Sequence, residues 1–425
     1  MRRSQRLYSE MLPDDRASHP ISKGEPGHPA EETRMRDLDC QARFSDVRME
    51  VLEDKFVSLS LAGRCVPDDA TYLLDVALHP VGAVLAVSCS NSALRLHDEA
   101  TLRLLGEYRG HGGRVCGLTF AHARPDLLYS ASADGTVRAW DVRRPGTDAA
   151  QVFRGDPSHS FCSFDLSCGD ALLCAGTSLD DEDSLLVFWD SRKPGVAPLG
   201  IYSESHSDDI TQVRFHPRDK DRLASGSTDG LVNVFDVRRG SEEEALLCTC
   251  NSESSAASVR WAAADGSRLL CLSHDEGLHL WDLRQLDTER PLAVFSCPDV
   301  RRAEVKPDGR GPEYLVGGAW LEGAGLLLVV GGDRGGDVQL MECDDEGLRL
   351  LGTLRGGHAS TVRCFVWDEA RGALVTGGED AQLLLWKPGG EEQDAGKKED
   401  RKSSSVFKLK SRPHKKHRYT KKPPY

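Results

Sequence analysis

The feature that most constrains this 425-residue chain is a short apolar run closing on Trp-Asp, or on a degenerate copy of it, about every forty to sixty residues. The seven closing pairs are His97-Asp98, Trp140-Asp141, Trp189-Asp190, Phe235-Asp236, Trp281-Asp282, Met341-Glu342 and Trp386-Lys387. A period of this length indicates an array in which no repeat can bury its apolar face alone. The copies must therefore pack side by side, which fixes the architecture but names no reaction.

Within each repeat, an apolar strand is followed by a Ser/Gly-flanked strand, a tight turn and a third strand that ends at the closing pair. Asp134-Gly135 and Asp229-Gly230 lie at such turns, where a hairpin requires positive φ at little cost. These repeats resemble WD40 repeats, each of which makes one four-stranded blade of a β-propeller. The prediction is an all-β, seven-bladed WD40 propeller.

The last repeat lacks an outer strand of its own, because Pro388-Gly389-Gly390 breaks the chain after Trp386. Residues 56–61 alternate apolar and polar side chains and can supply that strand, which removes an exposed sheet edge. We therefore expect a propeller over 49–390, closed by an N-terminal strand. Residues 1–48 and 391–425 are too poor in periodic apolar residues to pack, and they are predicted to be disordered extensions.

Charge and cysteine content limit the class of protein further. The net charge is −13, yet twelve Lys or Arg residues fall after residue 396 against two acids, so an acidic body carries a basic tail. No apolar run is long enough to cross a membrane. Thirteen scattered cysteines favour a reducing, intracellular compartment, and Cys248 and Cys250 have no second pair at metal-ligand spacing. We expect no cofactor, metal, membrane or small-molecule substrate.

Two repeats contain a Ser/His/Asp set that could be mistaken for a hydrolase triad. The sets are His111, Ser130, Asp134 and Trp140 in the second repeat, and His358, Thr376, Asp380 and Trp386 in the seventh. No Gly-x-Ser-x-Gly elbow accompanies them, and the same residues recur in both repeats. The resemblance to WD40 repeats implies instead a buried hydrogen-bond chain from Trp through Ser/Thr and His to Asp, so the protein is predicted not to be an enzyme.

Four arginines stand two residues beyond the closing Asp of consecutive repeats, and they are Arg143, Arg192, Arg238 and Arg284. They should line one arc of one propeller face, where a guanidinium forks onto a partner's carboxylates. The motif resembles the WDxR motif of substrate receptors of cullin-4 ubiquitin ligases, which implies docking of the ligase adaptor. The alternative is that each arginine pairs with nearby acids and is merely solvated.

The opposite face is predicted to carry an inserted acidic loop, formed by Asp180, Asp181, Glu182 and Asp183. The simpler explanation of such a run is that its carboxylates are solvated, and the more specific one is that they bind a basic segment of a partner.

The tail contains three basic pairs, Lys397-Lys398, Lys415-Lys416 and Lys421-Lys422. Such a tail suits nuclear or nucleolar targeting or non-specific contact with RNA, although it could instead fold back on the acidic body.

Three segments, 205–217, 228–236 and 378–387, resemble the WD repeat-containing protein 89 family, whose members start near the position of Met49. This resemblance implies a seven-bladed propeller that acts by protein contact and has no catalytic residues. We therefore predict a nuclear, non-enzymatic interaction scaffold. The alternatives are a cullin-4 substrate receptor and an RNA-associated or ribosome-assembly factor.

Overall fold

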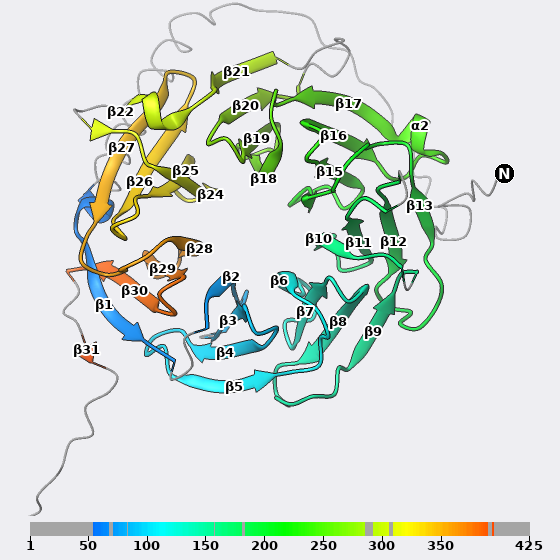
Figure 1. The fold of residues 1–425 in the computed structure, drawn as a ribbon, viewed down its shortest axis with the longest axis horizontal. Coiled ribbons are helices and arrows are strands. Elements are labelled where there is room, and N and C mark those ends of the chain that lie inside the picture. Colours follow the sequence, from blue (N-terminus) through cyan, green and yellow to red (C-terminus); the bar gives the residue numbers. More distant parts are fainter. Residues whose placement is uncertain are drawn as a thin grey trace, which may run out of the picture. The chain divides into compact units, whose positions relative to one another are not determined.

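The computed structural model describes residues 54–67, 71–82, 84–156, 158–180, 183–284, 292–305, 309–389 and 393–394. The expected N-terminal extension, the basic tail with its six targeting lysines, Asp181 and Glu182 lie outside these residues. Apart from one two-stranded hairpin, the described strands form seven largely antiparallel sheets arranged as the blades of a propeller (Figure 1). The predicted fold class is therefore confirmed.

Blades 1 to 6, numbered along the chain, are each built from four consecutive strands. Blade 1 has β2 (Leu73–Leu78), β3 (Val84–Cys89), β4 (Leu94–Asp98) and β5 (Leu104–Tyr108). Blade 2 has β6 (Val115–Phe120), β7 (Leu127–Ser132), β8 (Thr136–Asp141) and β9 (Gln151–Arg154). Blade 3 has β10 (Phe161–Leu166), β11 (Leu172–Thr177), β12 (Leu186–Asp190) and β13 (Gly200–Tyr202).

The next three blades repeat this plan. Blade 4 has β14 (Gln212–Phe215), β15 (Arg222–Gly226), β16 (Leu231–Asp236) and β17 (Leu246–Asn251). Blade 5 has β18 (Ala256–Ala262), β19 (Arg268–Ser273), β20 (Leu278–Asp282) and β21 (Leu292–Cys297). Blade 6 has β24 (Tyr314–Leu321), β25 (Leu326–Gly332), β26 (Val338–Asp344) and β27 (Gly347–Leu354).

Blade 7 joins the two ends of the propeller. Its strand order is β28 (Val362–Asp368), β29 (Ala373–Gly378), β30 (Leu383–Pro388), β1 (Leu59–Cys65) and β31 (Gln393–Asp394). β1 pairs antiparallel with β30 from Leu59↔Pro388 to Cys65↔Leu383, and β31 pairs parallel with β1. An N-terminal strand thus closes the ring, as predicted.

The closing strand begins three residues later than the predicted 56–61 segment. Residues 54–57 are helical, and the Ser58 amide donates to the Asp54 carbonyl at 3.0 Å. Phe56 is 2% exposed and packs on the ring of Trp367, with ring centroids 4.9 Å apart. The predicted start of the strand was wrong because a buried aromatic side chain on a helical turn looks the same in the sequence as one that points into the core from a strand.

In Figure 1 the first strand of each blade lies nearest the centre of the ring and the last strand lies at its rim. The apolar core lies mainly between neighbouring blades. One cluster combines Tyr129 and Phe153 of blade 2 with Phe161 and Trp189 of blade 3. A further cluster combines Leu94 of blade 1 with residues of blade 2. Each blade therefore depends on its two neighbours to bury its faces.

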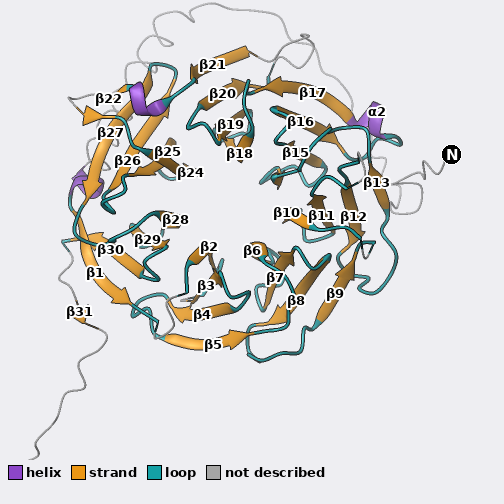
Figure 2. Cartoon of the chain, in the orientation of Figure 1, coloured by secondary structure: helices purple, strands orange, loops and turns teal. Residues whose placement is uncertain are grey.

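Connections add little regular structure (Figure 2). The short helix α2 (Glu242–Ala245) precedes β17, and a 3-10 turn, η1 (Val300–Arg302), follows β21. A small hairpin, β22 (Glu304–Val305) with β23 (Gly309–Arg310), lies in the link from blade 5 to blade 6. Val300 and Val305 are buried, so this link is anchored to the core.

Removal of β1 should open the ring. A chain that begins at Val66 leaves the outer edge of β30 unpaired and exposes the apolar faces that Leu59 and Phe56 cover. We expect Tm to fall by about 10 °C or more, with new aggregation, measured by circular dichroism and light scattering. A chain that begins at Met49 keeps β1 and should unfold like the full chain. Equal stability of all three would contradict closure by β1.

A carboxyl pair at the junction of blades 1 and 7 should make stability depend on pH. Glu99 is 2% exposed, and Arg371 donates to both Glu99 and Asp368. Burial, followed by the neighbouring Asp368, raises the pKa of Glu99 to about 7. The folded protein then holds a proton that the unfolded chain releases above its ordinary pKa, so the free energy of unfolding should decrease from pH 5 to 7.

The decrease attributable to Glu99 should be about 1–2 kcal/mol. Glu99→Gln, which cannot ionise, should remove it in urea titrations at pH 5, 6 and 7. An unchanged pH profile in this variant would show that Glu99 titrates normally.

Candidate functional site

The first sequence-predicted set lies in blade 2 and forms one continuous hydrogen-bond chain. His111 Nδ1 lies 3.0 Å from Asp134 Oδ2, and its Nε2 lies 2.8 Å from Ser130 Oγ. The Trp140 indole Nε1 donates to the same Ser130 Oγ at 2.9 Å. Gly135 follows Asp134 with φ of 72°, so the turn places the carboxylate beneath the histidine.

Blade 7 repeats this arrangement with a threonine in place of the serine. His358 Nδ1 lies 3.1 Å from Asp380 Oδ2, and Nε2 lies 2.8 Å from Thr376 Oγ1. Trp386 Nε1 donates to Thr376 Oγ1 at 2.9 Å. The two blades are therefore equivalent in their polar interiors.

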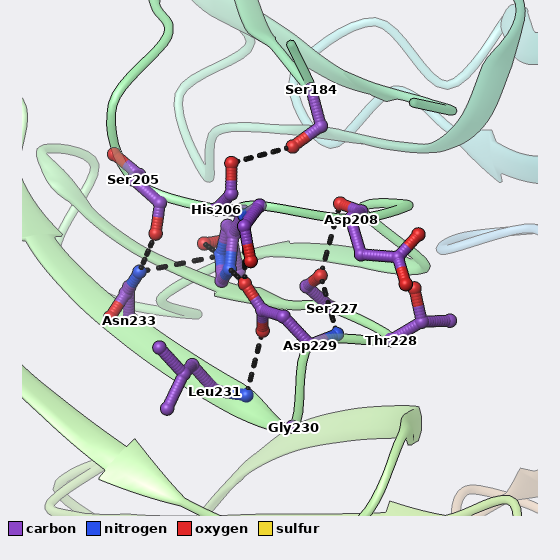
Figure 3. Close-up of polar contacts among 12 residues, drawn as sticks. Ser184, Ser205, His206, Asp208, Ser227, Thr228, Asp229, Gly230, Leu231 and Asn233 are labelled. Carbon is purple, nitrogen blue, oxygen red and sulfur yellow. Dashed lines mark hydrogen bonds and ion pairs between the residues drawn. The ribbon is translucent and has the colours of Figure 1, made fainter. Parts of the chain in front are cut away.

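A third chain, in blade 4, was missed at the sequence level. His206 Nδ1 lies 3.0 Å from Asp229 Oδ2, and Nε2 lies 2.7 Å from Ser225 Oγ. Figure 3 shows His206 between Asp229 and Asn233, whose Nδ2 donates to the Ser205 carbonyl at 2.6 Å. The sequence pattern of the other two chains includes a Trp, and blade 4 has Phe235 instead, although His206 precedes Ser225 by the same number of residues as His111 precedes Ser130.

These sets stabilise turns and offer no nucleophile. Ser130, Ser225 and Thr376 are each 0% exposed, so their hydroxyls cannot meet a substrate from solvent. Burial disfavours the charged form of Asp134, but hydrogen bonds from His111, Thr136 and the Gly112 amide outweigh it and hold the pKa of Asp134 well below its usual range. An anionic carboxylate fixed beneath a histidine ties the turn to the preceding loop.

Blade 3 keeps the tryptophan but lacks the rest of the chain. Ala175 occupies the strand position that Ser130 has in blade 2, and Trp189 Nε1 is buried without a hydrogen-bond partner among the described residues. A buried indole N–H that is left unpaired costs about 1–3 kcal/mol. Trp189 therefore contributes apolar packing alone.

The four arginines beyond the closing pairs share one geometry. In each, Nε and Nη2 donate to the two carboxylate oxygens of the Asp two residues earlier, and the pairs are Arg143 with Asp141, Arg192 with Asp190, Arg238 with Asp236, and Arg284 with Asp282. Their side chains are 56–67% exposed. Because each follows the third strand of blades 2 to 5, all four lie on one face of the propeller.

The carboxylates of these pairs are held in their charged form. The hydrogen bond from Arg143 lowers the pKa of Asp141 to about 2. Asp141 Oδ1 also accepts from the backbone amide of Arg143 at 3.0 Å, so the turn is fixed independently of the guanidinium. The alternative of local pairing with acids is therefore present in the structure, although it leaves more than half of each arginine exposed.

The predicted acidic loop lies on the opposite face, between β11 and β12. Asp180 and Asp183 exchange two backbone hydrogen bonds of 3.0 Å and are both exposed. Within the described ranges there is no helix long and apolar enough to cross a membrane. The same part of the chain contains no group of three or more His, Cys, Asp or Glu residues that could hold a metal ion.

Comparison with known proteins gives a consistent result. The family model described as "WD domain, G-beta repeat" matches residues 102–141, 198–236 and 348–387. The chain is 30% identical over 326 residues to WD repeat-containing protein GTS1 of Arabidopsis thaliana, covering 71% of this chain and 78% of that protein. It is 27% identical over 322 residues to the WD repeat-containing protein 89 homolog of Dictyostelium discoideum, covering 76% and 84% respectively.

A third similarity covers a shorter part of the chain. The chain is 33% identical over 152 residues to the ribosome biogenesis protein WDR12 homolog of Oryza sativa, covering 33% of this chain and 32% of that protein.

The hydrogen bond from Trp140 should be measurable against the unpaired Trp189. Trp140→Phe and Trp189→Phe remove similar volumes from buried sites, but only the first breaks a hydrogen bond. We expect Trp140→Phe to lower the free energy of unfolding by about 1 kcal/mol more than Trp189→Phe, measured by urea titration. An equal or larger loss in Trp189→Phe would mean that packing alone decides both.

Proposed function

The chain belongs to the WD40-repeat family, and we propose that it is a nuclear, non-enzymatic scaffold that holds partner proteins on its arginine-bearing face. A closed propeller is a rigid frame for protein interaction. The observation that carries the proposal is the array of Arg143, Arg192, Arg238 and Arg284, repeated in one geometry on four consecutive blades.

These ion pairs contribute little to folding, because exposed pairs are worth about 0–1 kcal/mol each. Their main effect is to hold the exposed arginine side chains in one conformation. Each Asp fixes a planar guanidinium while more than half of the side chain faces solvent. A partner that offers carboxylates therefore meets cations whose conformational freedom is already reduced, which favours specific docking.

One finer version of this function is a substrate receptor of a cullin-4 ubiquitin ligase. In that version the four arginines contact the ligase adaptor, and the opposite face, with the loop at Asp180 and Asp183, receives the substrate. The repeated Asp-x-Arg geometry supports it.

The second candidate function is assembly of ribosomal particles. It is supported by the similarity to a relative named as a ribosome biogenesis protein. The basic tail, with Lys397, Lys398, Lys415, Lys416, Lys421 and Lys422, would supply nucleolar targeting or salt-sensitive contact with RNA.

Proximity labelling in cells tests these assignments. The variants are Arg143→Ala/Arg192→Ala/Arg238→Ala/Arg284→Ala and a deletion of residues 397–425. We expect the quadruple variant to lose its main labelled partners by about tenfold, as expected for loss of charged hot-spot contacts. Its fold should persist because the backbone amides still donate to the Asp side chains.

The matched control is Arg334→Ala/Arg355→Ala, which removes two exposed arginines from the opposite face. Loss of the adaptor in the quadruple variant alone would support the receptor version. Loss of nucleolar proteins with the tail alone would support the assembly version. Labelling that is unchanged in the quadruple variant would contradict docking through the arginines.

A further inference from the structure

The innermost strands carry charged side chains into the centre of the ring. They are Asp75 on β2, Asp165 on β10, Arg214 on β14 and Arg260 on β18. A register shift occurs near the start of the first strand in six of the blades described, and a β-bulge of this kind bends a strand locally. Two adjoining cavities, of about 250 and 560 Å³, share Asp75, Arg214 and Arg260 in their walls.

The two carboxylates in this channel are already occupied by backbone amides. Asp75 accepts from the amides of Val76 at 2.9 Å and Leu118 at 3.2 Å. Asp165 accepts from the amides of Leu166 at 2.9 Å and Phe215 at 2.8 Å. Each therefore ties its own blade to the next, and every carboxylate oxygen has a donor.

The two arginines in the channel are less well satisfied. Arg214 uses Nη1 alone, donating to the carbonyls of Phe164 at 3.3 Å and Val213 at 3.1 Å. Arg260 also uses Nη1 alone, donating to Gln212 Oε1 at 3.4 Å and to the Val259 carbonyl at 3.0 Å. Within the described residues, Nε and Nη2 of both arginines make no hydrogen bond, and no ion pair within 4.0 Å joins them to Asp75 or Asp165.

Arg214 and Arg260 are only partly buried, and none of their nitrogens is among the buried unpaired side-chain atoms of the described residues, so these donors face the solvent space of the channel, where a ligand can reach them. Burial, and then the charge of Arg214, lowers the pKa of Arg260 to about 9, so the group is still cationic at neutral pH. Burial raises the pKa of Asp75 and of Asp165, against the opposing charge of Arg214.

Two further arginines stand where the larger cavity meets the surface. Arg363 pairs with Glu379, Nε to Oε1, at 2.8 Å. Arg114 is exposed and makes no ion pair to a described residue. This cavity is thus lined by four guanidinium groups and by the two carboxylates of Asp75 and Glu379. It opens beside the turn that follows β29, on the face opposite the four WDxR arginines.

We propose that the central channel binds a small polyanion, whose phosphate or carboxylate oxygens accept from Arg214 and Arg260 while Arg114 attracts it at the entrance. A guanidinium fork matches either oxyanion in a bidentate manner. The volume of about 560 Å³ suits a compact ligand of this class. Such a ligand was not foreseen from the sequence, and it is independent of the docking face proposed above.

The test is isothermal titration calorimetry of the full chain with pyrophosphate, and separately with citrate, at constant ionic strength. The two titrations distinguish a phosphate from a carboxylate ligand. We expect Arg260→Gln to weaken binding at least about tenfold and Arg114→Gln by about threefold, because a charge is worth more inside the channel than at its mouth. Arg144→Gln, on the opposite face, is the matched control and should change nothing.

Asp165→Asn supplies a readout that a structural role would not give. Its amide oxygen can still accept from the Phe215 amide, while the Leu166 amide loses its acceptor. A competing negative charge is gone, so pyrophosphate should bind about threefold or more tighter. If Arg260→Gln fails to fold, Arg114→Gln and Asp165→Asn still decide the question. Absence of heat for both anions with the wild-type chain, or equal weakening by Arg144→Gln, would overturn the proposal.

Discussion

The antiparallel pairing of β1 with β30 is the contact on which the rest of this structure depends. Without it, blade 7 keeps only three strands, the outer edge of β30 is unpaired, and the last sheet meets the first only through the packing of residues such as Val375 on Leu73. With it, every apolar face between blades is covered, as the cluster that joins Phe56 and Leu59 to blades 6 and 7 illustrates. Closure also fixes the angle between blades, so the arginines at one face and the charges in the channel take set positions.

The fold could be predicted because its signals are local and repeated. Each closing pair ends a third strand, and Gly135 and Gly230 take the positive φ that their turns require. The error at Phe56 and the omission of His206 share a cause. The roles of Phe56 and His206 depend on which side chains surround them in space. Neither the polarity of a residue nor a pattern that includes Trp contains that information. In blade 4, Ser225 hydrogen-bonds to His206 with no indole donor beside it, so a pattern taken from blades 2 and 7 does not identify this chain.

The channel lay beyond prediction for a different reason. Asp75, Asp165, Arg214 and Arg260 come from four blades, and each alone looks like an ordinary polar residue in a strand. Only the closed ring brings them around one axis. Placement of the four WDxR arginines on one face was foreseeable, because they occupy equivalent positions in consecutive repeats. Their pairing with the preceding Asp follows from a spacing of two residues across a tight turn.

The register of the pairing between β1 and β30 also determines how the ring responds to force. Leu59, where β1 begins, lies opposite Pro388, where β30 ends. Once β31 has detached from β1, the two chain directions leave the β1–β30 pair at the same end, and tension applied through them loads the hydrogen bonds one after another instead of all together. A pair of strands loaded in this unzipping geometry separates at far lower force than a pair loaded in shear. A scaffold tethered by both of its ends would yield first at its seam, while the other six blades stay folded.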